Sequence, residues 1–239
     1  MTILVTGATG RVGRHLVDQL VKRGARVRVL TRDRSKADMP EEVEVAEGDL
    51  LDIGAVRAAL SGVRTLFLLN AVTGDEFTQA ILTLNLAREA GVERVVYQSV
   101  FDADGAVNVP HFAVKSGAER MLAAMGFSAT ILRPAYFIEN DAMIADVVVE
   151  HGVYPVPIGS KGVAMIGTRD LAEIAVIELL RRDRAPGKLP IETIDVVGPE
   201  TLTGPQIASI WSDVLGRQVA YGGDDPSAFE ANMASAMPK

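Results

Sequence analysis

The stretch Thr2–Gly13, TILVTGATGRVG, joins a short apolar run to a loop with three evenly spaced glycines. The apolar run predicts a buried strand over Thr2–Thr6, and apolar residues at helical spacing predict a helix over Arg11–Arg23. Glycine adopts positive φ without strain and lets backbone N–H groups come close to a ligand. Because a helix N-terminus attracts anions, this strand, loop and helix are typical of a site for a dinucleotide pyrophosphate. The alternative is a tight turn that binds no ligand.

Strands and helices alternate through the first two-thirds of the chain. Further strands are predicted at Arg26–Thr31, Val43–Ala46, Thr65–Leu69, Arg94–Gln98 and Thr130–Arg133. Helices are predicted between them at Ile53–Leu60, Glu76–Ala90 and His111–Met125. This alternation favours right-handed crossovers between parallel strands. We therefore expect an α/β fold with a doubly wound, Rossmann-like parallel sheet and helices on both of its faces.

The last third of the chain is less regular. Helices are predicted at Asn140–Glu150, Thr168–Arg182, Pro205–Leu215 and Pro226–Met237, with a strand at Thr193–Val197 and turns with short strands over Val153–Ile166. The chain has 239 residues, which exceeds one average domain. We expect an NAD(P)-binding Rossmann-like domain over residues 1–150. Residues 151–239 are expected to form a small mixed substrate region, partly interleaved with the sheet.

Composition excludes several classes of protein. The 24 Lys and Arg residues against 31 Asp and Glu residues give a net charge of −7, which argues against nucleic acid or anionic membranes as partners. The absence of Cys excludes disulfides and thiolate chemistry, and it fits a cytoplasmic location. No apolar run reaches the roughly 18–20 residues of a membrane span, and no signal peptide is evident. His15 and His151 have no metal-ligand spacing, so no metal site is predicted.

The end of the second predicted strand indicates which dinucleotide binds. An NAD site usually has Asp or Glu at this position, whereas this chain has Arg32, followed by Arg34 and Lys36. A guanidinium suits the 2′-phosphate of NADP, and Arg11 could join it. We therefore expect NADPH to be preferred over NADH. Two alternatives remain: Asp33 could reach the ribose after a shift in register, or the charged loop could simply be solvated.

Longer blocks of sequence resemble the NmrA-like branch of the atypical short-chain dehydrogenases. The blocks are GATGRVG at 7–13, RVRVLTRD at 26–33, GDL at 48–50, LRPAYFIEN at 132–140 and VGPETLT at 197–203. They extend through nearly the whole chain, from Thr2 to about Tyr221. The family includes NADPH-dependent quinone, azo-dye and triphenylmethane reductases, and also proteins that bind the dinucleotide as sensors. The resemblance therefore implies NADP(H) binding more firmly than it implies catalysis.

The resemblance also implies roles for individual residues. The pyrophosphate would contact Gly7, Ala8, Thr9, Gly10, Arg11 and Val12, and the 2′-phosphate would lie near Arg32 and Lys36. Asp49 and Leu50 would flank the adenine, and Asn70 and Ala71 the nicotinamide-proximal ribose. Tyr136 would line the nicotinamide end and, with Phe137 and Asn140, the substrate pocket. These positions agree with the rule that ligands lie beyond the carboxyl ends of parallel strands. For Asp49, the alternative is a role in turning the chain.

The catalytic pair of short-chain dehydrogenases is incomplete. These enzymes commonly use Tyr-x-x-x-Lys, whose spacing places both side chains on one helix face. Here the matching residues are His111 and Lys115. Lys115 is a candidate ribose contact, the alternative being a surface lysine. His111 could donate a proton, but its ring is shorter than a phenol, and a structural or solvent role at the helix start is favoured.

Other possible catalytic groups are weaker. Tyr97 and Tyr136 are possible substitute proton donors, although Tyr97 fits a strand core better. Ser99 ends the fifth strand, where the family's dehydrogenases place a hydroxyl, and its role could be positional only. No residue is therefore assigned as catalytic.

The missing tyrosine argues against ordinary alcohol–ketone interconversion. Quinones and conjugated dyes delocalise the incoming negative charge, so they need a dedicated acid less. We expect an NADPH-dependent oxidoreductase that transfers hydride to a quinone-like or conjugated dye-like small molecule. The alternative is a non-catalytic NADP(H)-sensing regulator that acts through a protein partner. Because relatives usually continue beyond the position of Lys239, we expect a substrate pocket that is more open, or closed by a neighbouring subunit as in a homodimer.

Overall fold

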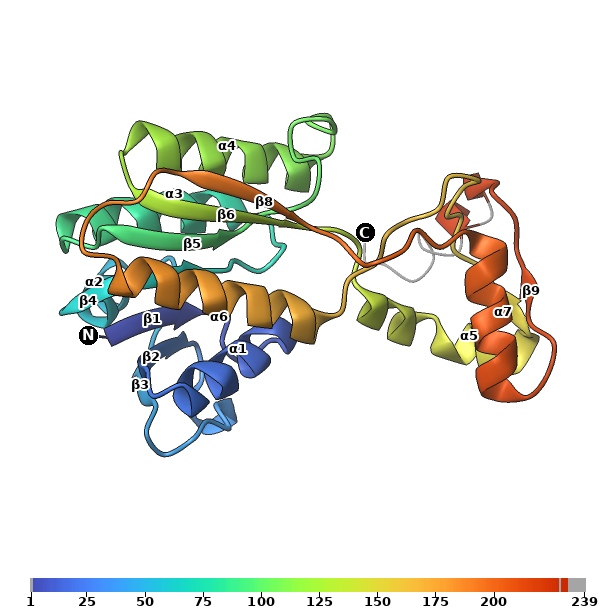
Figure 1. The fold of residues 1–239 in the computed structure, drawn as a ribbon, viewed down its shortest axis with the longest axis horizontal. Coiled ribbons are helices and arrows are strands. Elements are labelled where there is room, and N and C mark those ends of the chain that lie inside the picture. The colour runs from blue at the N-terminus through green and yellow to red at the C-terminus, as the bar shows by residue number, and fades with distance from the viewer. Residues whose placement is uncertain (1, 228, 232–239) are drawn as a thin grey trace. The chain divides into compact units, whose positions relative to one another are not determined.

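The computed structural model describes residues 2–227 and 229–231. Seven parallel strands form one sheet in the order β3-β2-β1-β4-β5-β6-β8 (Figure 1). The strands are β1 (Thr2–Thr6), β2 (Arg26–Thr31), β3 (Glu44–Glu47), β4 (Val63–Leu68), β5 (Arg94–Gln98), β6 (Ser128–Pro134) and β8 (Glu192–Val196). The chain winds outward from β1 in one direction and then from β4 in the other. The predicted doubly wound, Rossmann-like parallel sheet is therefore confirmed.

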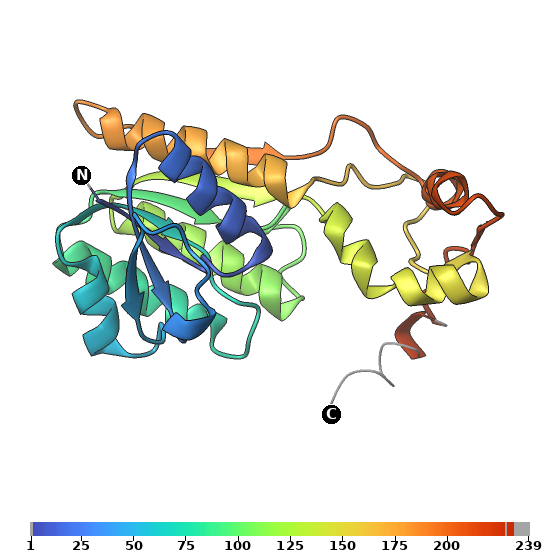
Figure 2. The same cartoon turned by 90° about the horizontal axis from the view of Figure 1, so that it is seen from below.

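Helices cover both faces of the sheet. On one face α1 (Arg11–Lys22) packs against α6 (Thr168–Arg184), and on the other α3 (Glu76–Glu89) lies between α2 (Ile53–Leu60) and α4 (Pro110–Ala124) (Figures 1 and 2). Every residue of β1 and β5 is buried, as expected for strands covered on two faces. Because all seven strands are parallel, they end at the same edge of the sheet, which is called the carboxyl edge below.

The chain forms two compact units. Unit 1 comprises Met1–Pro134 and Thr168–Val196, and unit 2 comprises Ala135–Gly167 and Val197–Lys239. The boundary predicted from the sequence lies at residue 150, whereas residues 135–150 belong to unit 2. Residues 168–196 lie in unit 1 because α6 packs on α1 and β8 pairs with β6.

Unit 2 is a small mixed assembly. It contains η2 (Ile138–Met143), α5 (Ala145–His151), β7 (Val153–Tyr154), α7 (Gly204–Leu215) and β9 (Ala220–Tyr221). The single helix expected over 140–150 is divided, because Ile144 separates a 3-10 turn from α5 with φ −114° and ψ 2°. Strands β7 and β9 pair in parallel. Of the helix expected over 226–237, residues 226–227 and 229–231 are helical, and the others lie outside the described residues.

Within residues 2–227 and 229–231, no helix has both the length and the apolar composition needed to cross a membrane. The same residues contain no cluster of three or more His, Asp or Glu side chains that could hold a metal ion.

Candidate functional site

The glycine loop between β1 and α1 leaves no room for larger side chains. Gly7 has φ +66°, and a Cβ there would lie 2.9 Å from Cγ of Leu69. A Cβ on Gly13 would lie 2.2 Å from the carbonyl oxygen of Gly7 and 2.6 Å from Cα of Ala8. Since both neighbours of Gly13 are backbone atoms, they cannot move aside without shifting the loop. Gly13 therefore lets α1 begin directly against the end of β1.

The N-terminus of α1 is open to an anion. Gly10 is the N-cap residue, with extended backbone and no side-chain cap hydrogen bond, and the first turn contains no acidic residue. The first N–H groups of a helix have no acceptor within the helix. Of the predicted pyrophosphate contacts, Thr9, Gly10 and Arg11 are exposed, whereas Ala8 and Val12 are buried and can contribute only through their backbone. The loop is held in place by Arg14, whose Nε donates to the carbonyl of Thr9 at 3.0 Å.

The charged segment Arg32–Lys36 after β2 contains one carboxylate, Asp33, which is bound to its own segment. Asp33 caps the short 3-10 helix η1 (Arg34–Lys36): its Oδ1 accepts from the backbone N–H of Ser35 at 2.9 Å and from the Ser35 hydroxyl at 2.6 Å. The ammonium of Lys36 lies 3.1 Å from the other oxygen. The hydrogen bonds from Ser35 and Lys36 hold the pKa of Asp33 below its ordinary value. Arg32 is exposed and makes no ion pair with the described residues.

Asp49 and Leu50 follow β3 at the carboxyl edge. Oδ1 of Asp49 accepts from the backbone N–H of Leu51 at 2.9 Å, so this side chain stabilises the turn after β3. Leu50 is half-buried and packs against the core cluster on the α2–α4 face. A Cβ on the preceding Gly48 would lie 2.2 Å from Cβ of Ala55, which brings this turn close to α2.

Asn70 has a buried side chain without hydrogen bonds. The hydroxyl of Thr6 accepts from the N–H of Leu69 at 2.8 Å and donates to its carbonyl at 2.9 Å, which ties the ends of β1 and β4 together. Asn70 comes next and is 3% exposed, and neither atom of its amide finds a partner among the described residues. An unsatisfied buried amide costs about 1–3 kcal/mol. Ala71, the other predicted ribose neighbour, is exposed beside it.

These features fit a bound dinucleotide. The uncapped N-terminus of α1 suits a pyrophosphate, and the glycines leave space for it against the backbone. A ribose has hydroxyls that both donate and accept, which are the complements that the Asn70 amide lacks. The residues present at the carboxyl edge of unit 1 are therefore compatible with the predicted cofactor.

Lys115 lies at the same edge in an ionic cluster that sequence reasoning missed. Its ammonium donates to the carbonyl of Gln98, the last residue of β5, at 3.0 Å and lies 3.0 Å from a carboxylate oxygen of Glu76. The other oxygen of Glu76 lies 2.8 Å from Nδ1 of His111. Lys115 is 3% exposed, so the alternative of a surface lysine was wrong. Glu76 is 35 residues from His111 in sequence, and no local pattern links them.

Burial and charge oppose each other in this cluster. Burial alone would raise the pKa of Glu76, but the hydrogen bond with His111 and the charge of Lys115 hold it below its ordinary value. Burial lowers the pKa of Lys115, and the Glu76 carboxylate offsets part of that shift. The carboxylate of Glu76 is therefore ionised at neutral pH, accepts a hydrogen bond from His111 and forms an ion pair with Lys115.

Tyr97 and Ser99 have structural surroundings. Tyr97 is fully buried in the core cluster below α3 and α4, and burial raises the pKa of its phenol. The Ser99 hydroxyl donates to the buried carboxylate of Glu119, which also accepts from Nε of Arg133 at 3.0 Å. The surroundings of both residues favour the core and positional roles considered for them above.

The predicted substrate residues lie in unit 2. Tyr136 is half-buried against the apolar cluster of that unit, and burial followed by the charge of Asp141 raises the pKa of its phenol. Its carbonyl accepts from the N–H of Ile166 at 3.0 Å. Phe137 bridges to the same strand-like segment, and the N–H of Asn140 donates to the Phe137 carbonyl at 3.0 Å. All three side chains are partly exposed and open to contact with a ligand.

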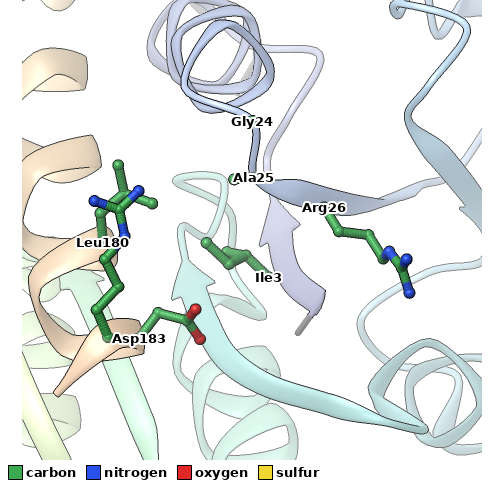
Figure 3. Close-up of a pocket in the computed structure, with 7 residues that line it drawn as sticks. Ile3, Gly24, Ala25, Arg26, Leu180 and Asp183 are labelled. Atoms are coloured by element: carbon green, nitrogen blue, oxygen red, sulfur yellow. The ribbon is translucent and has the colours of Figure 1, made fainter. Parts of the chain in front are cut away.

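A cavity of about 320 Å³ lies at the opposite edge of the sheet, where the strands begin (Figure 3). It is lined by Ile3, Gly24, Ala25, Arg26, Leu180, Asp183 and Arg184. Arg26 points away from Asp183 in Figure 3, and a carboxylate oxygen of Asp183 already accepts from the hydroxyl of Thr65 at 2.8 Å. This cavity has none of the phosphate-binding features of the carboxyl edge.

Known proteins resemble this chain along its whole length. The profile of the NmrA-like family matches residues 1–238. The NAD(P)H azoreductase of Xenophilus azovorans is 29% identical over 223 residues, which cover 92% of this chain and 76% of that protein. Quinone oxidoreductase 2 of Escherichia coli is 28% identical over 241 residues, which cover 98% of this chain and 81% of that protein.

Solved structures also resemble this chain along its length. The NADPH complex of the E. coli NADPH-dependent quinone oxidoreductase superposes with a TM-score of 0.88 at 28% identity, covering 99% of this chain and 83% of that one. The Citrobacter sp. triphenylmethane reductase superposes with a TM-score of 0.86, covering 100% and 85%; at 23% identity this likeness concerns the fold.

Proposed function

The chain belongs to the NmrA-like family, and from that premise we propose that it is an NAD(P)H-dependent oxidoreductase that reduces quinone-like or conjugated dye-like small molecules. The observation that carries the proposal is the uncapped glycine loop together with the unsatisfied amide of Asn70. Relatives with names that state the same chemistry, an azoreductase and a quinone oxidoreductase, support it.

Each part of the carboxyl edge has a proposed role in binding the cofactor. The first turn of α1 holds the pyrophosphate, Asp49 and Leu50 flank the adenine, and Asn70 with Ala71 lies against the nicotinamide-proximal ribose. Lys115 completes the ribose side: its ammonium has three hydrogen atoms, and the contacts with Gln98 and Glu76 occupy two of them. When bound, the reduced nicotinamide supplies the hydride.

Tyr136, Phe137 and Asn140 are proposed to line the acceptor pocket. An aromatic side chain stacks well on a flat, electron-poor acceptor. The protein's contribution is then alignment of two rings and exclusion of water.

The proposal includes a preference for NADPH over NADH. Asp33, the acid that could have bound the adenosine ribose of NADH, is occupied by Ser35 and Lys36. The Arg32 guanidinium remains exposed and suits a 2′-phosphate. This arrangement supports NADPH as the physiological reductant.

The function is tested by following the absorbance of NADPH after adding a benzoquinone, menadione or an azo dye. We expect oxidation of NADPH that depends on the acceptor and saturates with its concentration. Clear binding of NADPH without turnover of any of these acceptors would reject the oxidoreductase and favour the sensing regulator. The cytoplasmic location and the homodimer remain parts of the proposal, to be tested by cell fractionation and by sedimentation.

Replacing Asn70 by leucine is expected to separate stability from cofactor binding. The change removes a buried amide without partners, so the free energy of unfolding of the cofactor-free protein should rise by about 1 kcal/mol. NADPH affinity should fall about tenfold, because a hydrogen bond to the ribose is lost. Denaturant unfolding and a fluorescence titration measure the two quantities. Asn85→Leu is the control, since Asn85 lies exposed on α3; unchanged NADPH affinity in Asn70→Leu would contradict the assignment.

A further inference from the structure

His111 stands where short-chain dehydrogenases commonly have the catalytic tyrosine, and its ring contacts the carboxylate of Glu76. We propose that His111 donates the proton that completes reduction of a quinone-type acceptor, and that Glu76 is the positioning residue that orients its ring. The inference rests on the proposed function and adds to it the residues that handle the proton. The observation behind it is a buried carboxylate that contacts both His111 and Lys115.

The cluster belongs to unit 1 and lies at its carboxyl edge, where the nicotinamide end of the proposed cofactor site is expected. Lys115 reaches the carbonyl of Gln98 at the end of β5, and β5 pairs with β4, whose end carries Asn70. His111 is the second residue of α4 at the same carboxyl edge, four residues before Lys115. His111 and Lys115 therefore both lie beside the nicotinamide end of the proposed cofactor site.

The hydrogen bond to Glu76 fixes the tautomer of the His111 ring. Glu76 is 2% exposed and ionised, so it accepts, and Nδ1 of His111 must carry the hydrogen. Glu76 is the only polar partner of this ring among the described residues. The His111 side chain is 27% exposed, which gives a small molecule or water access to it. Nε2, the nitrogen left over, is thus the one that can exchange a proton with a ligand.

Each charged group near the His111 ring has a partner of opposite charge. Glu76 faces His111 from α3, Lys115 lies on α4 over the ring of Tyr97 at 5.1 Å, and Glu119 on α4 also acts on Lys115. The charge of Glu119 is compensated by Arg133 of β6. Glu76 is therefore the nearest charge to His111, and it places a negative group beside the ring on the side of Nδ1.

The proton balance follows from the acceptor's chemistry. Hydride transfer to a quinone forms a hydroquinone monoanion. The protonated His111 ring gives its Nε2 proton to that oxygen, the N–H bond breaks as the O–H bond forms, and the neutral ring recovers a proton from water. Hydride transfer to a carbocationic triphenylmethane dye gives a neutral product directly and needs no proton. The two acceptors therefore differ in their need for His111.

The ratio of quinone turnover to cationic-dye turnover tests this difference in one protein sample. We expect His111→Gln to lower that ratio on the order of 100-fold, the usual contribution of a general acid. Glu76→Gln keeps the shape but removes the charge, and it should lower the ratio about tenfold. His15→Gln, an exposed histidine on α1, is the matched control and should keep the wild-type ratio.

A second readout does not depend on turnover. The chain has three histidines, so ¹⁵N-labelled histidine gives a simple spectrum that His111→Gln assigns. In the cofactor-free protein, we expect His111 to show a hydrogen on Nδ1, with His15 and His151 as exposed references. A hydrogen on Nε2 of neutral His111 would overturn the Glu76 contact.

The outcomes separate the inference from the proposed function. A wild-type ratio in His111→Gln, or an equal loss with both acceptors, overturns His111 as the proton donor while the oxidoreductase stands. A wild-type ratio in Glu76→Gln overturns the positioning role. If the wild type reduces neither acceptor, the proposed function fails and the proton-donor role fails with it.

Discussion

Gly13→Ala is expected to lower NADPH affinity on the order of 100-fold and to reduce the free energy of unfolding by about 2–3 kcal/mol. The added Cβ would lie 2.2 Å from the carbonyl oxygen of Gly7 and 2.6 Å from Cα of Ala8, both backbone atoms of the loop. The start of α1 must therefore move away from β1, and the N–H groups that face the pyrophosphate move with it. A fluorescence titration with NADPH and denaturant unfolding measure the two effects.

Gly187→Ala is the matched control for this variant. A Cβ on Gly187 meets nothing within 4 Å, and its φ lies outside the left-handed range. It lies between α6 and β8, away from the glycine loop. We expect wild-type NADPH affinity and stability in this control. If Gly13→Ala behaves like Gly187→Ala, the close approach of α1 to β1 is not what forms the phosphate site.

Arg32→Glu is expected to reverse the choice of dinucleotide. NADPH affinity should fall about 100-fold, because a charge-assisted hydrogen bond to the 2′-phosphate is replaced by repulsion between two negative charges. NADH affinity should stay the same or rise, since a carboxylate at this position can accept from the ribose hydroxyls. Titrations of both dinucleotides with wild type and variant measure the ratio of the two dissociation constants.

The control for Arg32→Glu makes the same charge change at the other end of β2. Arg26 is exposed at the start of β2, whereas Arg32 follows its end. Arg26→Glu should therefore leave the NADPH-to-NADH ratio unchanged. Equal ratios in wild type and Arg32→Glu, or wild-type affinity for NADH that matches NADPH, would contradict the role of Arg32. Because strong salt screens exposed charges, the titrations are compared at one low ionic strength.

Cofactor binding and proton transfer involve different groups at the carboxyl edge of unit 1. The glycine loop and Asn70 concern cofactor binding, and they would serve a sensor as well as an enzyme. The Glu76–His111 contact concerns proton transfer, which only an enzyme needs. Finding that contact in a chain that lacks the usual tyrosine supports turnover over sensing.

The sequence was sufficient for the sheet, because each strand and helix carries its own local pattern. The apolar run of Thr2–Thr6 and the amphipathic spacing of the next helix are read from neighbouring residues, and both elements begin where predicted. The spacing of the three glycines in the loop likewise predicts, from neighbouring residues alone, that the backbone can come close to a ligand. The division into two units was not local: α6 and β8 return to the sheet from the last third of the chain. Only long-range packing decides which unit they join.

Some features of the site can likewise be predicted from local sequence, and others arise only from tertiary contacts. Arg32 and Lys115 are recognisable from the motifs that contain them, and their roles stay predictions. The occupation of Asp33 by Ser35, the unsatisfied amide of Asn70 and the burial of Lys115 appear only in the folded chain. Glu76 could not be linked to His111 from sequence, because a hydrogen bond between residues on adjacent helices leaves no periodic signal. Local chemistry thus determined the fold and the cofactor loop, while the packing of α3 on α4 decided which groups surround the reacting edge.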